Sequence, residues 1–211
     1  MNRTDIPQPP NADSDTATRP RVAAVLLAAG TSTRMGAFKQ LLPYRGSTIV
    51  QTCVQTLRAS SADAVFVVVG HRSDEVRRVL VDEPVTIVDN TEYLDGMSTS
   101  VKAGMLAVGD SFDAVMICLC DQPHLAVSVI DAVLDAYRRS RRPIVVPQYA
   151  GDTGHPAIFD LSLRAEILAV DPTTGLRSVT YDHRADTLRV PVDTVGVLDD
   201  MDTTEDYERL R

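Results

Sequence analysis

The sequence has no excess of positive charge. It contains 21 lysines and arginines against 29 aspartates and glutamates, and its formal net charge is −8. The densest basic cluster, at positions 138–142, falls at the end of an expected helix, where cations interact favourably with the helix dipole. The charge balance therefore argues against a nucleic-acid-binding surface.

Long apolar runs are also missing. No stretch reaches the ~18 residues that a membrane span needs, and residues 1–20 lack the apolar core of a signal peptide. That segment holds four prolines and almost no large apolar side chains, so we expect a disordered tail. The remaining residues, 21–211, are expected to form one cytoplasmic domain.

Cysteine is scarce. The three cysteines form no C-x-x-C pair, and Cys118 and Cys120 lie in an apolar run. This usage predicts reduced thiols in the core of a cytoplasmic protein rather than disulfides or zinc ligands.

Both standard phosphate loops are absent as well. The apolar run 22–29 opens into a turn in which Gly30 and Gly36 are separated by five residues and followed by alanine. This spacing argues against a P-loop NTPase and a dinucleotide-binding fold. What is present is a buried strand that ends in a loop rich in glycine and hydroxyl groups, with the cations Arg34 and Lys39. Backbone N–H groups and two positive charges at such a position predict a polyphosphate site.

The rest of the chain alternates between apolar and amphipathic segments. Strands are expected at 64–69, 85–88, 114–120 and 144–147, and helices at 48–59, 73–80, 98–108 and 128–139. This alternation predicts an α/β fold with a parallel sheet and right-handed crossovers. Beyond it we expect a hairpin or loop at 149–159, short helices at 163–168 and 176–181, an antiparallel strand at 187–192, and a terminal helix capped by Thr203 or Thr204.

Two polar segments lie where strands are expected to end. Gly96, Ser98 and Ser100 stand at the start of helix 98–108, which could be an anion or base-edge site or only a capped helix. Asp121 directly follows strand 114–120, and ligands bind outside the carboxyl ends of strands in open α/β sheets. A carboxylate together with substrate phosphates is a usual Mg²⁺ site, although Asp121 could equally cap the next helix.

The C-terminal segment carries three further carboxylates close together. Asp199, Asp200 and Asp202 repel one another unless a cation lies among them, and Asp200 and Asp202 share a side if the segment is extended. Glu205 and Asp206 are explained by the first turn of the terminal helix.

Several of these segments resemble one family. The string LAAGTSTRMGAFKQLLP resembles the loop of the MobA-like nucleotidyltransferases, in the version carried by molybdenum cofactor cytidylyltransferases. Positions at the family's spacing are Gly30, Arg34, Met35, Gly36, Lys39, Leu42 and Pro43. G-M-S-x-S, D-Q-P, G-H-P and the final D-x-D-T-x-E-D resemble further family motifs in the same order, with Thr204 in place of the usual proline. The resemblance covers residues 22–211.

The resemblance implies a three-layer α/β/α nucleotide-diphospho-sugar transferase (Rossmann-like) fold with a mostly parallel sheet. It implies transfer of CMP from CTP to a phosphate-bearing acceptor, a molybdopterin-type molybdenum cofactor, with release of pyrophosphate and possible contact with a molybdoenzyme. No nucleic acid or membrane is expected to be bound. Cytosine is favoured because the loop reads A-A-G, as in the cytidylyltransferases, where the guanylyltransferases read L-A-G-G.

The same resemblance assigns site residues. Arg34, Lys39 and Asp121 are the catalytic candidates. Nucleotide-binding candidates are Leu27, Ala28, Ala29, Gly30, Arg34, Lys39, Gly70, Gly96, Ser98 and Ser100. Mg²⁺ is expected at Asp121 with Asp200, slightly favoured, or Asp202. Acceptor-binding candidates are Gln122, Gly154 and His155.

Two alternatives remain open at this point. One is another transferase of the same fold, a guanylyltransferase or an enzyme that makes an NDP-sugar or NDP-alcohol. The other is a maturation protein that binds nucleotide without catalysis.

Overall fold

The computed structural model describes residues 19–171 and 175–211. Most of the expected N-terminal tail therefore lies outside the described residues. Its last two positions are held against the domain: Arg19 forms an ion pair with Asp63 at 2.6 Å, and the Pro20 carbonyl accepts a hydrogen bond from Arg138 at 3.4 Å.

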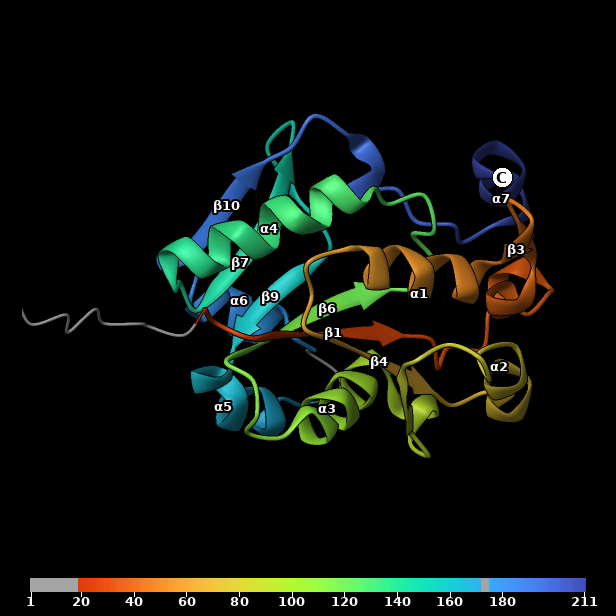
Figure 1. Cartoon of the computed structure of the whole chain (residues 1–211), viewed down its shortest axis with the longest axis horizontal. Helices are drawn as coiled ribbons and strands as arrows, with labels where there is room; N and C mark the ends of the chain where they lie inside the picture. Colours follow the sequence, from red (N-terminus) through yellow and green to blue (C-terminus); the bar gives the residue numbers. More distant parts are fainter. Residues whose placement is uncertain (1–18, 172–174) are drawn as a thin grey trace, which may run out of the picture.

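One large sheet forms the centre of the molecule (Figure 1). Its strands are β1 (Val22–Leu27), β4 (Ala64–Val69), β5 (Thr86–Asp89), β6 (Ala114–Leu119), β7 (Ile144–Tyr149), β8 (Asp152–Thr153), β9 (Ala157–Asp160) and β10 (Thr187–Pro191). The spatial order is β10-β7-β9-β6-β1-β4-β5, and β8 pairs with β7. A small separate hairpin joins β2 (Pro43–Tyr44) to β3 (Ser47–Thr48).

The sheet is mostly parallel, as expected, with β9 antiparallel to both of its neighbours. The prediction that strand 187–192 is antiparallel was wrong, because β10 pairs in parallel with β7, from Thr187 opposite Ile144 to Pro191 opposite Gln148. The reason is that β9 already returns the chain to the edge where β7 begins. The strand that follows β9 therefore starts from that edge and runs in the direction of β7.

Helices cover both faces of the sheet. They are α1 (Ile49–Ala59), α2 (Ser73–Val79), α3 (Met97–Val108), α4 (Val127–Ser140), α5 (Arg164–Ala169), α6 (Arg177–Asp182) and α7 (Thr204–Leu210). In Figure 1, α1 and α4 lie on one side of the strands, and α3 and α5 lie on the other. The three-layer α/β/α architecture expected from the sequence is confirmed.

The apolar run after Arg21 is continuous because both faces of β1 are covered. Ala24 and Leu26 point into the core under α1 and α4, whereas Ala23 and Val25 point into the core under α3 and α5. A strand buried on both faces needs apolar residues at every position rather than at alternate ones. Helix α1 starts where expected, since Thr48 and Gln51 form a capping box.

The three cysteines are free and buried, as predicted. Burial raises the pKa of the Cys118 thiol, which keeps it protonated and unreactive.

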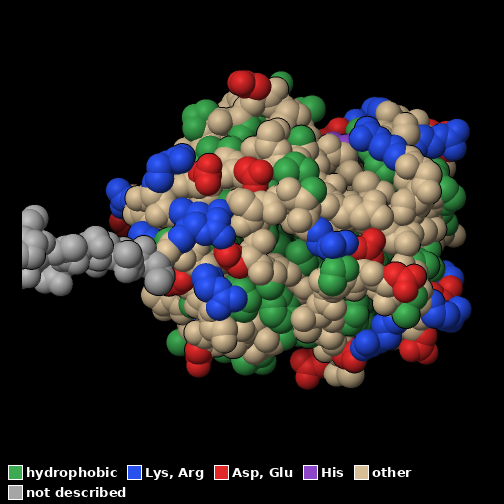
Figure 2. Space-filling view, in the orientation of Figure 1, with side chains coloured by type: hydrophobic (Ala, Val, Ile, Leu, Met, Phe, Trp, Pro, Cys, Tyr) green, Lys and Arg blue, Asp and Glu red, His purple; other side chains and the backbone are tan. Residues whose placement is uncertain are grey.

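In the described part of the chain, no helix combines the length and apolar character that crossing a membrane requires. On the face drawn in Figure 2, basic and acidic side chains are interspersed.

Helix α3 packs against β1 at residue 104, where only a glycine fits. A Cβ atom at Gly104 would overlap Val25, whose side chain is fully buried. This close approach places the N-terminal end of α3 near the carboxyl end of β1, where the phosphate loop begins.

We expect Gly104→Ala to destabilise the protein by ~1 kcal/mol, because overpacking a core costs ~1–3 kcal/mol and the gain in helix propensity is only ~1 kcal/mol. Urea unfolding monitored by circular dichroism measures the change. Leu106→Ala, at an exposed position of the same helix, is the control and should change stability by less than ~0.5 kcal/mol. A stabilised Gly104→Ala variant would show that α3 can move away from β1.

Candidate active site

A cavity of about 280 Å³ opens over the carboxyl ends of β1 and β6, beside the N-terminal end of α3. It brings together nine of the site residues proposed from the sequence. These are Leu27, Ala29, Gly30, Arg34, Lys39, Gly96, Ser100, Asp121 and Asp202. The cavity stands where an open α/β sheet binds its ligands, at the strand ends.

The loop between Gly30 and Lys39 is fixed from inside by Gln40, which is 2% exposed. The Gln40 amide donates to the carbonyls of Ala28 at 3.2 Å and Gly30 at 2.9 Å. The Ser32 hydroxyl donates to the Gln40 side-chain oxygen at 3.0 Å and accepts from the Lys39 backbone N–H at 3.2 Å. Sequence reasoning missed Gln40, although an amide directly before the apolar pair Leu41 and Leu42 was a usable signal.

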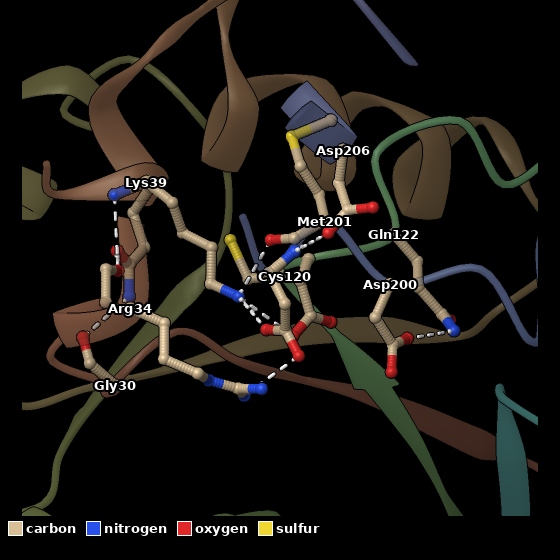
Figure 3. Close-up of polar contacts among 12 residues, drawn as sticks. Gly30, Arg34, Lys39, Cys120, Gln122, Asp200, Met201 and Asp206 are labelled. Atoms are coloured by element: carbon tan, nitrogen blue, oxygen red, sulfur yellow. Dashed lines mark hydrogen bonds and ion pairs between the residues drawn. The ribbon is translucent and has the colours of Figure 1, made fainter. Parts of the chain in front are cut away.

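The Lys39 amine lies at the centre of the site (Figure 3). It donates to Asp121 at 3.1 Å, to Asp202 at 3.0 Å and to the Met201 carbonyl at 3.1 Å. Burial by itself would lower the pKa of this amine, but the charges and hydrogen bonds of Asp121 and Asp202 outweigh burial and raise it. Lys39 is therefore a permanent cation at neutral pH.

Arg34 pairs with the Asp202 carboxylate from the mouth of the cavity. Its guanidinium lies 2.8 Å from Asp202, and its side chain is 73% exposed. An ion pair this exposed contributes little to stability. Arg34 is thus free to exchange the Asp202 carboxylate for another anion at low energetic cost.

Asp121 is only half satisfied. Its Oδ2 accepts from Lys39, while its buried Oδ1 has no hydrogen-bond partner within residues 19–171 and 175–211. A buried carboxylate oxygen without a partner is costly and needs a donor or a cation. Within the same ranges no cluster of three or more metal-ligating side chains is preformed. The arrangement fits an ion such as Mg²⁺, which is bound by one or two carboxylates and completed by water and phosphates.

Asp200 and Asp202 differ in what they contact. Asp200 lies outside the cavity lining and accepts from the Gln122 amide at 2.9 Å. Its pKa is raised by partial burial and by the nearby charge of Asp121. Asp202 lines the cavity and pairs with both cations of the loop. The slight preference for Asp200 drawn from the sequence therefore contrasts with the position of Asp202 inside the cavity.

Helix α7 holds the segment that carries Asp202. Thr203, one of the two predicted caps, is the N-cap residue and forms a capping box with Asp206. Asp206 also accepts from the backbone N–H of Asp202 at 3.2 Å. The Thr203 hydroxyl and Arg209 lower the pKa of Asp206 to about 2. Asp206, which the sequence reading gave no chemical role, thus positions the backbone of a cavity residue.

The N-terminal end of α3 forms the opposite wall. The helix begins at Met97, one residue before the first predicted start, because Gly96 adopts a backbone conformation with φ of 112° and acts as the N-cap residue. Ser100 lines the cavity and accepts from Asn90 at 2.9 Å. Ser98 is buried outside the lining, and its hydroxyl has no partner in the described part of the chain.

Tyr93 is a second residue that the sequence reading missed. It lines the cavity, and a Cβ atom at Gly70 would lie 2.7 Å from it. Gly70 was proposed to bind the nucleotide, yet it lies outside the cavity lining and makes room for the Tyr93 ring. Ala28 is likewise outside the lining, buried under the loop.

The three acceptor candidates lie beside this cavity rather than in its lining. Gln122 donates to the Val197 carbonyl at 3.3 Å as well as to Asp200. The His155 backbone N–H donates to the same carbonyl at 3.0 Å. A Cβ atom at Gly154 would overlap that carbonyl, so the contact requires glycine. These residues join the loop before β9 to the segment that leads to Asp200.

A loop that presents cations after β1, facing carboxylates that follow β6 and precede α7, defines the chain as an α/β protein of the NTP transferase class. The match to a family model agrees with this definition. The model of the MobA-like NTP transferase domain matches residues 24–187, well over half of the chain. The protein belongs to this family of nucleotidyltransferases.

The relatives bear different names. The chain is 31% identical over 202 residues to the nicotine blue oxidoreductase of Paenarthrobacter nicotinovorans, covering 90% of this chain and 97% of that protein. It is 24% identical over 189 residues to the molybdenum cofactor cytidylyltransferase of Escherichia coli K12, covering 88% and 93%.

Solved structures agree in fold. Rv0371c of Mycobacterium tuberculosis H37Rv superimposes with a TM-score of 0.81 at 27% identity, over 92% of this chain and 98% of that one. A complex of Rv0371c with manganese has a TM-score of 0.77 at 26% identity, over 90% and 97%.

The histidine beside the cavity gives stability a pH dependence. Burial lowers the pKa of His155 below its ordinary 6.5, against an opposing effect of Asp121. The unfolded chain therefore binds more protons, and this contribution is fully present above the unfolded pKa and lost as the pH falls below it. We expect urea unfolding of His155→Gln to show a shallower loss of stability from pH 7 to pH 5 than the wild type.

Burial also lowers the pKa of His124, so this residue contributes to the same pH dependence of the free energy of unfolding. The variant His124→Gln should therefore also lose less stability than the wild type between pH 7 and pH 5. The double variant should show the smallest loss. Parallel stability curves for wild type and His155→Gln would contradict the assignment of a neutral, buried imidazole to His155.

Proposed function

We propose that the protein is a Mg²⁺-dependent cytidylyltransferase that moves CMP from CTP to a phosphate-bearing acceptor of the molybdopterin type. The observation that carries the proposal is the Lys39 amine, held as a cation between Asp121 and Asp202 at the bottom of the loop cavity. Such a fixed charge suits a reaction in which negative charge moves between phosphate oxygens.

The reaction needs positioning more than covalent chemistry. An acceptor phosphate oxygen attacks the α-phosphorus of CTP, a new P–O bond forms, and the bond to the β-phosphate oxygen breaks, so that pyrophosphate leaves with the electron pair. The attacking phosphate is already anionic, and no general base is required. Lys39 and Arg34 would contact the triphosphate and stabilise the charge on the leaving group.

Magnesium fits the carboxylates that the cavity presents. Asp121 would bind it through the buried Oδ1 that has no partner in the described residues, together with Asp202 or Asp200. When bound, Mg²⁺ would neutralise phosphate charge and fix the geometry of the phosphates. The manganese complex of Rv0371c, a protein similar to this one, supports a divalent cation at this fold.

The choice of cytosine rests on the floor of the cavity. Ala29 lines the cavity and is 3% exposed, so its methyl group takes up space that a glycine would leave open. A narrower floor favours a pyrimidine over the larger guanine. The similarity to the molybdenum cofactor cytidylyltransferase of Escherichia coli supports the same base and a molybdenum cofactor as acceptor.

A second candidate is an oxidoreductase that acts on nicotine blue. It is favoured by the 31% identity to the nicotine blue oxidoreductase, higher than the 24% to the cytidylyltransferase. The G-x-G-x-x-G loop of dinucleotide-binding folds is absent from the phosphate loop, which counts against it. Mixing the protein with nicotine blue and NADH or NADPH, and following the colour, tests this candidate directly.

We expect CTP to bind ~10- to 100-fold more tightly than GTP, since one methylene-sized difference in a pocket is worth ~1–3 kcal/mol. Calorimetry with four Mg–NTPs gives the affinities, and pyrophosphate release with molybdopterin as acceptor gives the activity, which EDTA should abolish. Ala29→Gly should reduce the difference between CTP and GTP. Equal or tighter binding of GTP by the wild type would overturn the choice of cytosine and leave nucleotidyl transfer in place.

Lys39→Ala should lower kcat by ~100-fold or more, because loss of one preorganised charge costs ~3 kcal/mol at the transition state. Lys102→Ala is a matched control, since Lys39 and Lys102 are the only two lysines in the sequence. Lys102 donates to the Val170 carbonyl, away from the cavity, so its variant should keep full activity. A Lys39→Ala enzyme with wild-type kcat would show that the amine only stabilises the fold.

A further inference from the structure

A larger cavity, of about 610 Å³, lies next to the candidate active site on the face of the sheet that α6 covers. Its floor is apolar and consists of Ile144 and Val146 of β7 and Phe159 of β9. Helix α6 forms one wall, and β10 with the loop before β9 forms the other. We call this cavity the arginine groove.

Three arginines face the arginine groove, Arg177 and Arg184 from the α6 segment and Arg189 from β10. Within the described residues, none of them forms an ion pair with a carboxylate, whereas most other arginines there do, including Arg142, which is also exposed. The chain carries a net charge of −8. Three cations with no carboxylate partner among the described residues, gathered at one apolar groove of an acidic protein, indicate that the groove receives an anion.

The groove also presents a flat surface. The guanidinium of Arg184 lies 4.3 Å from the centre of the Tyr181 ring, and Tyr181 is 65% exposed. An exposed aromatic ring with a guanidinium stacked on it offers planar area of the kind on which ring systems stack. The hydroxyls of Thr153 and Thr180 line the same space and supply hydrogen bonds.

The arginine groove reaches the edge of the sheet at which Asp121 lies. Strand β9 is antiparallel to β6, with Ala157 opposite Ile117, so the residues that precede β9 lie beside those that follow β6 (Figure 1). His155 lines the groove, and its backbone N–H binds the Val197 carbonyl that Gln122 also contacts. A ligand in the groove can therefore extend one end to the phosphate cavity.

We propose that the arginine groove binds the distal end of the acceptor, a planar ring system that carries an anionic group. The ring lies against Tyr181 and Arg184, and the anionic group is held by Arg177 and Arg189. This assignment rests on the proposed transfer function, since it takes the molecule in the groove to be the acceptor. It adds that the acceptor is recognised through its ring and a second negative charge, in addition to the reacting phosphate.

The test uses 6-carboxypterin, a fluorescent planar anion, titrated into the full-length protein with and without Mg–CTP. Arg177→Gln and Arg189→Gln should each weaken binding by ~10-fold or more, because a charge-assisted contact is worth ~1.5–3 kcal/mol. Arg189→Lys should keep part of the affinity. Arg139→Gln, on α4 at the other face of the sheet and 74% exposed, is the control and should bind as the wild type does.

Calorimetric binding of Mg–CTP in every variant shows whether the fold and the phosphate cavity remain intact. Unsubstituted pterin lacks the carboxylate and should bind to the wild type more weakly than 6-carboxypterin does. In each glutamine variant, the two compounds should bind with similar affinity. Affinity for 6-carboxypterin that is the same in wild type, Arg177→Gln and Arg189→Gln would overturn the proposal, as would full competition by inorganic phosphate alone.

The two proposals fail separately. The glutamine variants could lose 6-carboxypterin binding while the wild type releases no pyrophosphate from any NTP. That result would support the proposed role of the arginine groove and contradict the proposed transfer function. Pyrophosphate release from CTP, with a KM for the acceptor that is unchanged in Arg177→Gln and Arg189→Gln, would give the opposite answer. It would support the transfer function and contradict the proposed role of the groove.

Discussion

The three-way contact of the Lys39 amine joins parts of the chain that are far apart in sequence. Asp121 follows β6, and Met201 and Asp202 precede α7, so one cation connects the phosphate loop to both segments. Without it, two carboxylates would face each other in a half-buried cavity. With it, their charge is balanced, and their oxygens stay close to the position that a polyphosphate and its metal would occupy. The same contact that stabilises the site therefore also keeps it ready for exchange of ligands.

The groups around this concentration of charge are held in place by hydrogen bonds and close packing. Gln40 fixes the loop through the carbonyls of Ala28 and Gly30, and the Met201 backbone N–H is bonded to the Asp121 carbonyl at 2.9 Å. Gly104 brings α3 against β1, which sets the distance across the cavity. Precise placement of a cation relies on such a supporting shell of contacts, since a displaced charge loses most of its effect on a transition state.

The sequence alone indicated much of this, for reasons that particular residues make clear. The unbroken apolar run of β1 identified a doubly covered strand, and the cations behind it identified the loop. The direction of β10 could not be inferred, because it depends on where β9 ends and not on the residues of β10. Gln40 and Tyr93 were missed because their roles come from contacts with backbone carbonyls and with Gly70, which no local pattern reports. The sequence slightly favoured Asp200 over Asp202, and it could not show that the Gln122 amide, distant in sequence, engages Asp200.

The reversed strand β9 has a consequence for how this architecture can change over time. It separates a block of four parallel strands, β1, β4, β5 and β6, from the pair β7 and β10. The first block holds the phosphate loop, and the second forms much of the arginine groove. Among the described residues, strand pairing between the blocks passes only through β9. The second block can therefore acquire new side chains while the first keeps its geometry. Proteins with this fold can therefore change the second substrate while they keep the phosphate site. Such a division is consistent with relatives of similar length whose names differ.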